Sequence, residues 1–223
     1  MKTEDFWINK KVLVTGGTAG LGKALHLELN KQGAKTARVA RSGDQSVIRG
    51  DVSNKNQVHR IFAEAISQLG SVDVLINNAS TLGPTPLKLL MDTECEDFED
   101  VLQTNLLGPF RLIKLATSQM ILRQSGVIVN ISSDAAVSAY PRWGSYGISK
   151  AALDHMSRIF QIELELTGVK FLALDPGDMN TELHLSAVPD ADRSTLHDPA
   201  DSAQLILQQI ANQQFLPIRR GIR

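Results

Sequence analysis

The sequence is poor in cysteine and in net charge. Cys95 is its only cysteine, so no internal disulfide can form, and we expect this residue to be a bystander. The 23 basic residues nearly balance the 24 acidic ones, the formal net charge is −1, and no block of lysine and arginine stands out. The chain therefore lacks the electrostatic signature of a protein that binds nucleic acid or a membrane surface.

Long apolar runs and metal-ligand patterns are also missing. No stretch approaches the roughly 18 apolar residues that a membrane span needs, and MKTEDFWINKK at the start lacks the apolar core of a signal peptide. We therefore expect a cytoplasmic protein. The five histidines are scattered, with no pair at the spacing of metal ligands on a helix, so we expect no metal site.

What the sequence does contain is an alternation of short aliphatic runs and longer helical patterns. The runs are apolar on both faces, as in strands of a parallel sheet covered by helices on both sides. They are KVLVTG (11–16), TARVA (36–40), SVIRG (46–50), VDVLINNA (72–79), GVIVNIS (126–132) and VKFLALDPG (169–177). Helical patterns fall near residues 20–32, 55–69, 96–123, 146–167 and 199–213. This alternation predicts one α/β domain over residues 1–223, a doubly wound, Rossmann-type parallel sheet in three α/β/α layers.

The stretch VTGGTAGLGKA, residues 14–24, fits two phosphate-binding motifs. A Walker A loop would need Ser or Thr to hold Mg²⁺ at the position of Ala24. The other motif is a dinucleotide-binding turn, in which Gly16 allows a sharp bend, Gly20 a close approach of the backbone to pyrophosphate, and Gly22 close helix packing. The turn alone is weak evidence for either motif. Its candidate cofactor contacts are Gly16, Thr18, Gly20, Leu21 and Gly22.

Two strand ends could serve the adenosine half of a dinucleotide. Asp51, followed by Val52, closes one strand, where its carboxylate would accept from an adenine amino group or, equally, cap a helix. Arg41 ends another strand, with Arg38 close behind it, and a base at this position favours a ribose 2′-phosphate. We therefore expect NADP(H) to be preferred, with NAD(H) possible.

A catalytic constellation is found in NISSDAAVSAYPRWGSYGISKAAL, residues 130–153. Tyr146 and Lys150 are four residues apart at the start of a helical pattern, so their side chains share one face. Ser133 follows the strand GVIVNIS at its carboxyl end, the edge where open α/β sheets bind ligands.

Six features in register resemble the short-chain dehydrogenase/reductase family and span most of the chain. They are T-G-x-x-x-G-x-G over 15–22, D-V at Asp51, N-N-A over 77–79, Asn105 in LQTNLLGPF, Ser133 thirteen residues before Tyr146 together with Lys150, and P-G at Pro176 with Thr181 beyond it. The resemblance implies an NAD(P)-dependent oxidoreductase that reduces a carbonyl or oxidises an alcohol.

The resemblance also implies a role for each catalytic residue. Tyr146 would be the general acid/base, Lys150 would supply positive charge and bind the nicotinamide ribose, and Ser133 would orient the carbonyl. A phenol with a pKa near 10 needs a neighbouring cation to become phenolate at neutral pH. Asn105 has a physical argument of its own, because Pro109 has no N–H for the carbonyl at i−4, which the family uses to hold a water. An ordinary proline kink is the alternative.

Further candidates line the expected cofactor and substrate clefts. In the family, Asn77 and Ala79 would line the adenosine side, although Asn residues also cap strand ends, and Pro176, Gly177 and Thr181 would approach the nicotinamide, although Thr181 could instead cap a helix. Residues 177–199 are the one long stretch without a periodic pattern, which predicts a substrate lid. Weaker candidates for the pocket border are Leu82, Arg142, Trp143, Asp178 and Met179.

The chain departs from the family pattern in three places. Only nine residues separate Arg41 from Asp51, too few for the usual helix, so the adenosine side should be more open. Ser80 replaces the frequent Gly after N-N-A, and the C-terminus QFLPIRRGIR lacks the frequent V-D-G-G ending.

We expect a small-molecule partner and a homo-oligomer, and two rival functions stay open. A small carbonyl or alcohol is the expected substrate, and pairing of the helices in 96–123 and 146–167 would make a homodimer or homotetramer, as the resemblance implies. One rival is a regulatory or sensor protein that binds NAD(P) without turnover. The other is a kinase or ATPase that uses Lys23.

Overall fold

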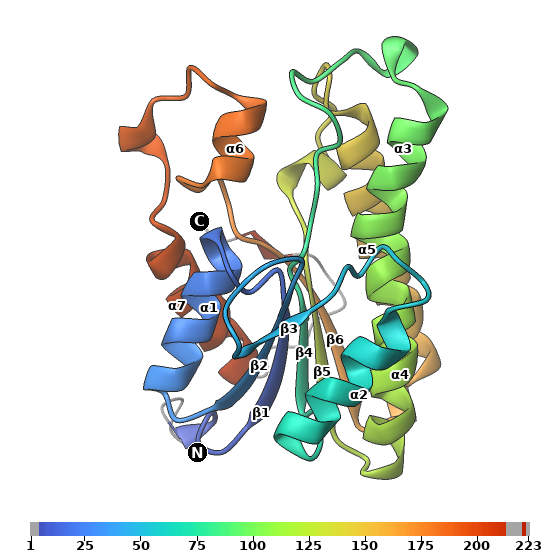
Figure 1. The fold of residues 1–223 in the computed structure, drawn as a ribbon, viewed down its shortest axis with the longest axis vertical. Helices are drawn as coiled ribbons and strands as arrows, with labels where there is room; N and C mark the ends of the chain where they lie inside the picture. The colour runs from blue at the N-terminus through green and yellow to red at the C-terminus, as the bar shows by residue number, and fades with distance from the viewer. Residues whose placement is uncertain (1–4, 213–219, 222–223) are drawn as a thin grey trace.

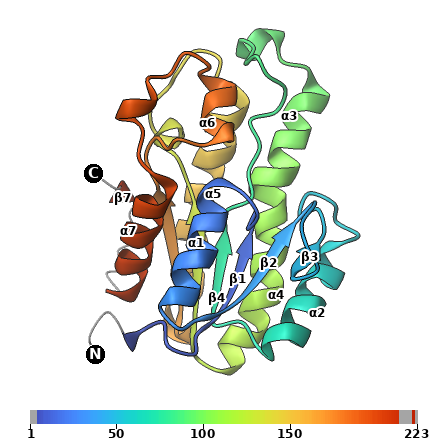
Figure 2. The ribbon, with the colours of Figure 1, turned by 60° about the vertical axis from the view of Figure 1, so that its left-hand side comes forward.

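The computed structural model describes residues 5–212 and 220–221, which form a parallel sheet between two helical layers (Figures 1 and 2). The strands are β1 (Lys11–Thr15), β2 (Lys35–Ala40), β3 (Val47–Arg49), β4 (Val74–Asn77), β5 (Gly126–Ile131), β6 (Val169–Asp175) and β7 (Arg220–Gly221). They lie in the order β3-β2-β1-β4-β5-β6-β7, and every neighbouring pair is parallel. The predicted doubly wound α/β sheet is confirmed.

Helices cover both faces of this sheet. On one face lie α1 (Gly20–Lys31) and α7 (Pro199–Ala211), and on the other lie α2 (Val58–Leu69), α4 (Gly108–Leu122) and α5 (Gly144–Glu163) (Figure 1). Each face has its own core of buried side chains: Val12 and Val14 of β1 pack toward α1 and α7, whereas Leu13 packs toward α2 and α4. The strands are apolar on both sides because alternate side chains enter different cores.

The chain order places the functional edge of the sheet. β1 is hydrogen-bonded to both β2 and β4, so the connections leave β1 in opposite directions across the sheet. In open α/β sheets, ligands bind beyond the carboxyl ends of the strands at such a switch point. The glycine turn follows β1 at this edge, and α6 (Glu182–Ala187) and α3 (Cys95–Leu102) rise beyond the sheet on the two sides of the same end (Figure 1).

One predicted helix is interrupted. The pattern over 96–123 becomes α3, a π-helical turn over Gln103–Leu107, and α4, in which Pro109 lies in the first turn. Proline cannot donate the backbone hydrogen bond of a continuous α-helix, and a single π turn is a common way to accommodate the lost bond. The break predicted beside Asn105 is therefore present, as a π turn.

The connection between β2 and β3 and the stretch after β6 are both irregular or contain only short elements. No helix separates β2 from β3 within the short segment 41–46, as the nine-residue spacing predicts. The stretch 177–199, which has no periodic pattern, contains α6 and a 3-10 turn at Arg193–Thr195. These elements are too short to leave a periodic signal in the sequence.

β7 is a two-residue strand beside β6, and it is the only part of the QFLPIRRGIR ending that the structure describes. Across the described parts of the chain, no helix combines the length and apolar character of a membrane span. In the same residues, no three His, Cys, Asp or Glu side chains form a cluster that would bind a metal ion.

Candidate active site

The glycine turn is shaped by two glycines that touch. Gly16 has a φ of +68°, and a Cβ added to Gly22 would lie 2.1 Å from the carbonyl oxygen of Gly16. A side chain at Gly22 would therefore push α1 away from the end of β1. The same Cβ would lie 2.5 Å from Nδ2 of Asn78, so the amide of Asn78 also fills this corner.

Gly20 faces the segment after β6 from the first turn of α1. Its φ is +46°, and a Cβ there would lie 3.2 Å from Cγ2 of Thr181. Thr181 also caps α6, because its Oγ1 accepts a hydrogen bond from the backbone N–H of His184 at 3.3 Å. Thr181 therefore caps α6 and also lies beside the glycine turn. Its position agrees with both predictions for it, a helix cap and a cofactor contact.

The remaining turn residues differ in what they expose. Leu21 is buried in the core, so only its backbone faces the turn, whereas Thr18 is half-buried. Ala19 makes no side-chain cap to α1, and the first turn of α1 carries no acidic residue. The orphan N–H groups at this helix end are therefore suited to an anion. Lys23, the lysine of the Walker A alternative, has an exposed side chain.

Thr15 and Asn78 join the ends of β1 and β4, a role that the sequence analysis did not assign. Oγ1 of Thr15 accepts the backbone N–H groups of Asn78 and Ala79, both at 3.0 Å. Nδ2 of Asn78 donates to the carbonyl of Thr15 at 2.9 Å and to that of Gly16 at 3.3 Å. These bonds hold the turn and the N-N-A segment together. The only sequence signal for them was the pairing of T-G with N-N-A in the family pattern.

Asn77 differs from the expectation that it lines the cofactor cleft. Its side chain is buried and donates through Nδ2 to Oδ1 of Asn130 at 2.8 Å, and Asn130 donates to Ser157 of α5 at 2.8 Å. Consecutive strand residues point to opposite faces. The side chain of Asn77 therefore lies on the α5 face of the sheet, whereas that of Asn78 points to the glycine turn. Ala79 is half-buried beside Gly16.

On the adenosine side, Asp51 forms a local turn. Its Oδ1 accepts from the backbone N–H of Ser53 at 2.9 Å and from the hydroxyl of Ser53 at 2.7 Å. Asp51 does not cap a helix, because α2 begins at Val58 with Gln57 before it. Its contact with adenine stays a prediction. Val52 is buried against α4, because a Cβ on Gly108 would lie 2.9 Å from the Val52 carbonyl oxygen. Arg41 is exposed at the end of β2.

Ser133 is held by the side chain of Asp134, a contact that the sequence did not predict. Its hydroxyl donates to Oδ1 of Asp134 at 3.0 Å and accepts from the backbone N–H of Ala135 at 3.1 Å. The hydroxyl of Tyr140 donates to Oδ2 of Asp134 at 2.7 Å. The carboxylate of Asp134 therefore connects the loop before α5 to Ser133 and sets the direction of its hydroxyl.

Tyr146 is buried at the start of α5, with only 8% of its surface exposed. Burial raises the pKa of its phenol to about 12, and hydrogen bonds with the hydroxyls of Ser133 and Ser80 act in the opposite direction. The phenol is therefore protonated throughout the neutral range. Burial therefore outweighs the hydrogen bonds of the phenol in setting its pKa.

Lys150 lies one helical turn beyond Tyr146 and is 2% exposed. Its Nζ donates to the carbonyl of Ile131 at 2.8 Å and lies 5.4 Å from the centre of the Tyr146 ring. Burial lowers the pKa of the ammonium to about 8, although the carboxylates of Asp154 and Asp175 favour the charged form. Lys150 is thus mostly charged at neutral pH and loses that charge in mildly basic solution.

Asn105 connects the loop after β4 to α5 from the π turn. Its Oδ1 accepts from the backbone N–H of Thr81 at 2.8 Å and from the hydroxyl of Ser80 at 3.1 Å. Its Nδ2 donates to the Thr81 carbonyl at 2.9 Å and to the hydroxyl of Ser149 at 3.0 Å. Ser80, which replaces a frequent glycine, therefore contacts both Asn105 and Tyr146.

A cavity of about 300 Å³ lies at the carboxyl edge of the sheet. Ser133 and Tyr146 line it from the catalytic side, and Pro176, Gly177 and Thr181 from the segment after β6. Four of the five weaker candidates also line it: Leu82, Trp143, Asp178 and Met179. The fifth, Arg142, is exposed and lines a separate, smaller pocket.

The residues present fit a dinucleotide. Gly16, Gly20 and Gly22 place no side chain of their own on the turn, and the uncapped start of α1 offers N–H groups to a pyrophosphate. The cavity beside Tyr146 and Lys150 has room for a planar ring and a small substrate. Pyrophosphate at the turn and nicotinamide in the cavity would follow the edge of the sheet across its switch point.

A family model described as short chain dehydrogenase matches residues 10–192. The chain belongs to the short-chain dehydrogenase family. This membership makes the protein an oxidoreductase with a nicotinamide cofactor, NAD(P), acting on a small-molecule substrate. The Walker A interpretation of the glycine turn is excluded by the same match, because the turn lies within it.

Short-chain dehydrogenases of several kinds are similar to this chain. The 3-oxoacyl-(acyl-carrier-protein) reductase FabG of Staphylococcus epidermidis is 33% identical over 186 residues, covering 76% of this chain and 75% of the relative. Glucose 1-dehydrogenase of Gluconobacter oxydans is 30% identical over 85% of this chain and 77% of its own length. The solved structure of ElxO with NADP bound is 28% identical, with a TM-score of 0.84 over 96% of this chain and 97% of that chain.

Proposed function

We propose that this short-chain dehydrogenase reduces a ketone or aldehyde, and oxidises the alcohol in reverse, with Tyr146 as its general acid/base. The observation that carries the proposal is a buried phenol that borders the cavity beside the hydroxyl of Ser133. A phenol that stays protonated at neutral pH is suited to donate a proton to the oxygen of a carbonyl.

Each neighbouring residue has a distinct part in this proposal. Asp134 and the backbone N–H of Ala135 hold the Ser133 oxygen in place. When a substrate binds, the Ser133 hydroxyl turns its proton from Asp134 to the substrate oxygen and orients that oxygen toward Tyr146. The ammonium of Lys150 places positive charge behind the phenol and stabilises the phenolate that remains after proton transfer. Asn105 keeps the loop after β4 and α5 in register, so that both hydroxyls face the cavity. A bound nicotinamide would supply the hydride.

We further propose that NADP(H) is preferred to NAD(H). Arg41 lies exposed just after β2 and Arg38 lies on β2 against the glycine turn, so two cations are available for a ribose 2′-phosphate. ElxO, with NADP bound, supports the same choice.

Residues 177–199 act as the substrate lid in this proposal. Asp178 and Met179 line the cavity together with Leu183 and His184 of α6. The segment turns back to the sheet through a bridge between Met179 and His197. The whole chain is proposed to act as a single domain.

A homodimer or homotetramer is proposed to form through α4 and α5. Both helices expose large apolar side chains, among them Phe110, Leu122, Ile159 and Ile162. Exposed apolar surface of this kind on neighbouring helices is typical of subunit interfaces. Light scattering in solution measures the mass directly, and a monomer would contradict this part of the proposal.

Titration with NADPH and NADH, followed by rate measurements on a panel of ketones and aldehydes, tests the function. We expect saturable NADPH binding that is tighter than NADH binding, and turnover of at least one carbonyl. Nucleotide binding without turnover of any carbonyl would favour the regulatory alternative, which the adjacency of Ser133, Tyr146 and Lys150 argues against.

A further inference from the structure

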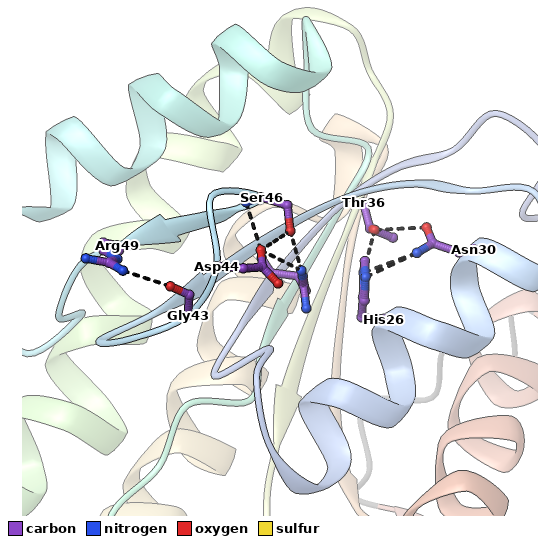
Figure 3. Close-up of polar contacts among 8 residues, drawn as sticks. His26, Asn30, Thr36, Gly43, Asp44, Ser46 and Arg49 are labelled. Atoms are coloured by element: carbon purple, nitrogen blue, oxygen red, sulfur yellow. Dashed lines mark hydrogen bonds and ion pairs between the residues drawn. The ribbon is translucent and has the colours of Figure 1, made fainter.

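Arg38 lies at the meeting point of the glycine turn and the short segment 41–46. Its side chain leaves β2 on the face covered by α1, and a Cβ added to Gly17 would lie 2.9 Å from Cβ of Arg38. Nearby, the His26 imidazole on α1 bonds to Thr36 at 2.7 Å, and burial, followed by the charge of Arg38, lowers its pKa (Figure 3). The guanidinium of Arg38 is therefore the positive charge of this corner at neutral pH.

Asp44 pairs with that guanidinium. Its Oδ1 lies 3.6 Å from Nη2 of Arg38, and the hydroxyl of Ser46 bonds to both side chains. The backbone N–H of Ser46 also donates to Oδ1 of Asp44 at 2.8 Å, so a local turn aims the carboxylate (Figure 3). The hydrogen bonds from Ser46, and then the charge of Arg38, lower the pKa of Asp44, which keeps it ionised at neutral pH.

The short connection between β2 and β3 produces this pairing. Without a helix between the strands, the chain turns directly from Arg41 to Val47, and Asp44 folds back over β2. Arg49 donates to the Gly43 carbonyl at 2.9 Å and closes the turn on its other side (Figure 3). The Asp44 carboxylate is therefore paired with the Arg38 guanidinium, a cation that would otherwise be available to a ribose 2′-phosphate.

We propose that Asp44 determines cofactor specificity by competing with a ribose 2′-phosphate for the guanidinium of Arg38. A nucleotide with a 2′-phosphate must displace the Asp44 carboxylate and approach its negative charge, whereas a nucleotide with a free 2′-hydroxyl need not. The preference for NADP(H) is then smaller than two arginines would provide, because one of them is already paired. The inference rests on the proposed use of NADP(H) and adds the residue that limits it.

Adenosine 2′,5′-bisphosphate and adenosine 5′-monophosphate, titrated by calorimetry, test the proposal without catalysis. Asp44→Asn keeps an oxygen for the Ser46 N–H and removes only the charge. We expect it to tighten binding of the bisphosphate by about threefold to tenfold, as for a partly screened charge pair, and to leave binding of the monophosphate unchanged. The same variant should bind NADPH more tightly than the unaltered protein does, and NADH with unchanged affinity.

A matched control is available in the lid segment. Asp192 forms the same turn, with its Oδ1 accepting from the N–H of Ser194 at 2.9 Å and from its hydroxyl at 2.7 Å. Asp192→Asn changes the net charge and the turn in the same way at another site. An equal gain in bisphosphate affinity in this variant would attribute the effect to net charge and overturn the proposal.

The Arg38→Gln variant tests whether Arg38 is the group for which Asp44 and the 2′-phosphate compete. There, Asp44→Asn should no longer change the ratio of the two affinities, since additivity fails only for groups that interact. A gain of the same size without Arg38, or no gain in the Arg38-containing protein, would overturn the proposal. Failure of all four nucleotides to bind would instead overturn the proposed function, so the two failures are distinguishable.

Discussion

The burial of Lys150 makes the pH dependence of the reaction predictable. Its ammonium has a pKa of about 8, lowered by burial, and Asp154 on the next turn of α5 opposes that shift. If the charged form of Lys150 is needed for catalysis, kcat/KM for carbonyl reduction falls as the pH rises through about 8. This fall is the basic limb of the pH profile, and at lower pH kcat/KM should not depend on the charge of Lys150.

Removal of Asp154 should move this limb toward lower pH. Two unit charges one helical turn apart, about 6 Å, interact by about 1.4 to 2.8 kcal/mol at an effective dielectric of about 20 to 40. Because Asp154 favours the charged form of Lys150, Asp154→Asn lowers the pKa of the ammonium by about 1 to 2 units. At about pH 7.5 the charged fraction, and with it kcat/KM, should fall about 3-fold to 25-fold.

The assay is the initial rate of loss of nicotinamide absorbance, with limiting carbonyl, across the neutral and basic range. Asp154→Glu keeps the charge and should restore the limb. Glu163→Gln removes an exposed carboxylate from the end of the same helix and should leave the limb in place. An unchanged limb in Asp154→Asn, with the protein folded by circular dichroism, would refute the assignment of the limb to Lys150.

Two further predictions concern the glycine turn and the serine. Gly22→Ala places a Cβ 2.1 Å from the backbone oxygen of Gly16, a clash that no rotamer relieves, so we expect about 1 to 3 kcal/mol lower stability by denaturant unfolding and at least about tenfold weaker NADPH binding. Asp134→Asn weakens the charged acceptor of the Ser133 hydroxyl, so we expect kcat to fall about 3-fold to 10-fold with unchanged nucleotide affinity.

Controls separate these effects from general damage. For Gly22→Ala, binding of NADPH at the native affinity would contradict the close contact on which the turn depends. As a second variant beside Asp134→Asn, Tyr140→Phe removes the hydrogen bond from the Tyr140 hydroxyl to the same carboxylate and should also reduce kcat. A loss of nucleotide affinity in Asp134→Asn would show that the carboxylate supports the cofactor rather than Ser133.

The sequence was sufficient for the layers of the fold and for the register of the catalytic motif. Six apolar runs predicted the six longer strands because strands buried on both faces leave an unbroken apolar signal. Tyr146 and Lys150 could be placed together because the helical repeat brings residues four apart onto one face. The helix break beside Asn105 was predicted from the missing N–H of Pro109, whereas its π-helical form was not.

Other parts of the site depend on contacts between segments, which local patterns do not encode. The contact of Asp134 with Tyr140 requires the conformation of the loop between them. The choice between Asn77 and Asn78 depends on the residue at which β4 ends, since one step in register exchanges the two faces of a strand. The protonation of Tyr146 depends on burial, which outweighs its hydrogen-bonding neighbours.

The most direct test of the central claim is the activity of Tyr146→Phe. The substitution removes only the hydroxyl from a ring that packs 5.6 Å from Trp143, so the cavity wall is preserved. The account predicts that NADPH still binds with native affinity, while carbonyl reduction falls about 100-fold to 10,000-fold, the contribution of a general acid. Native turnover by Tyr146→Phe would contradict the account.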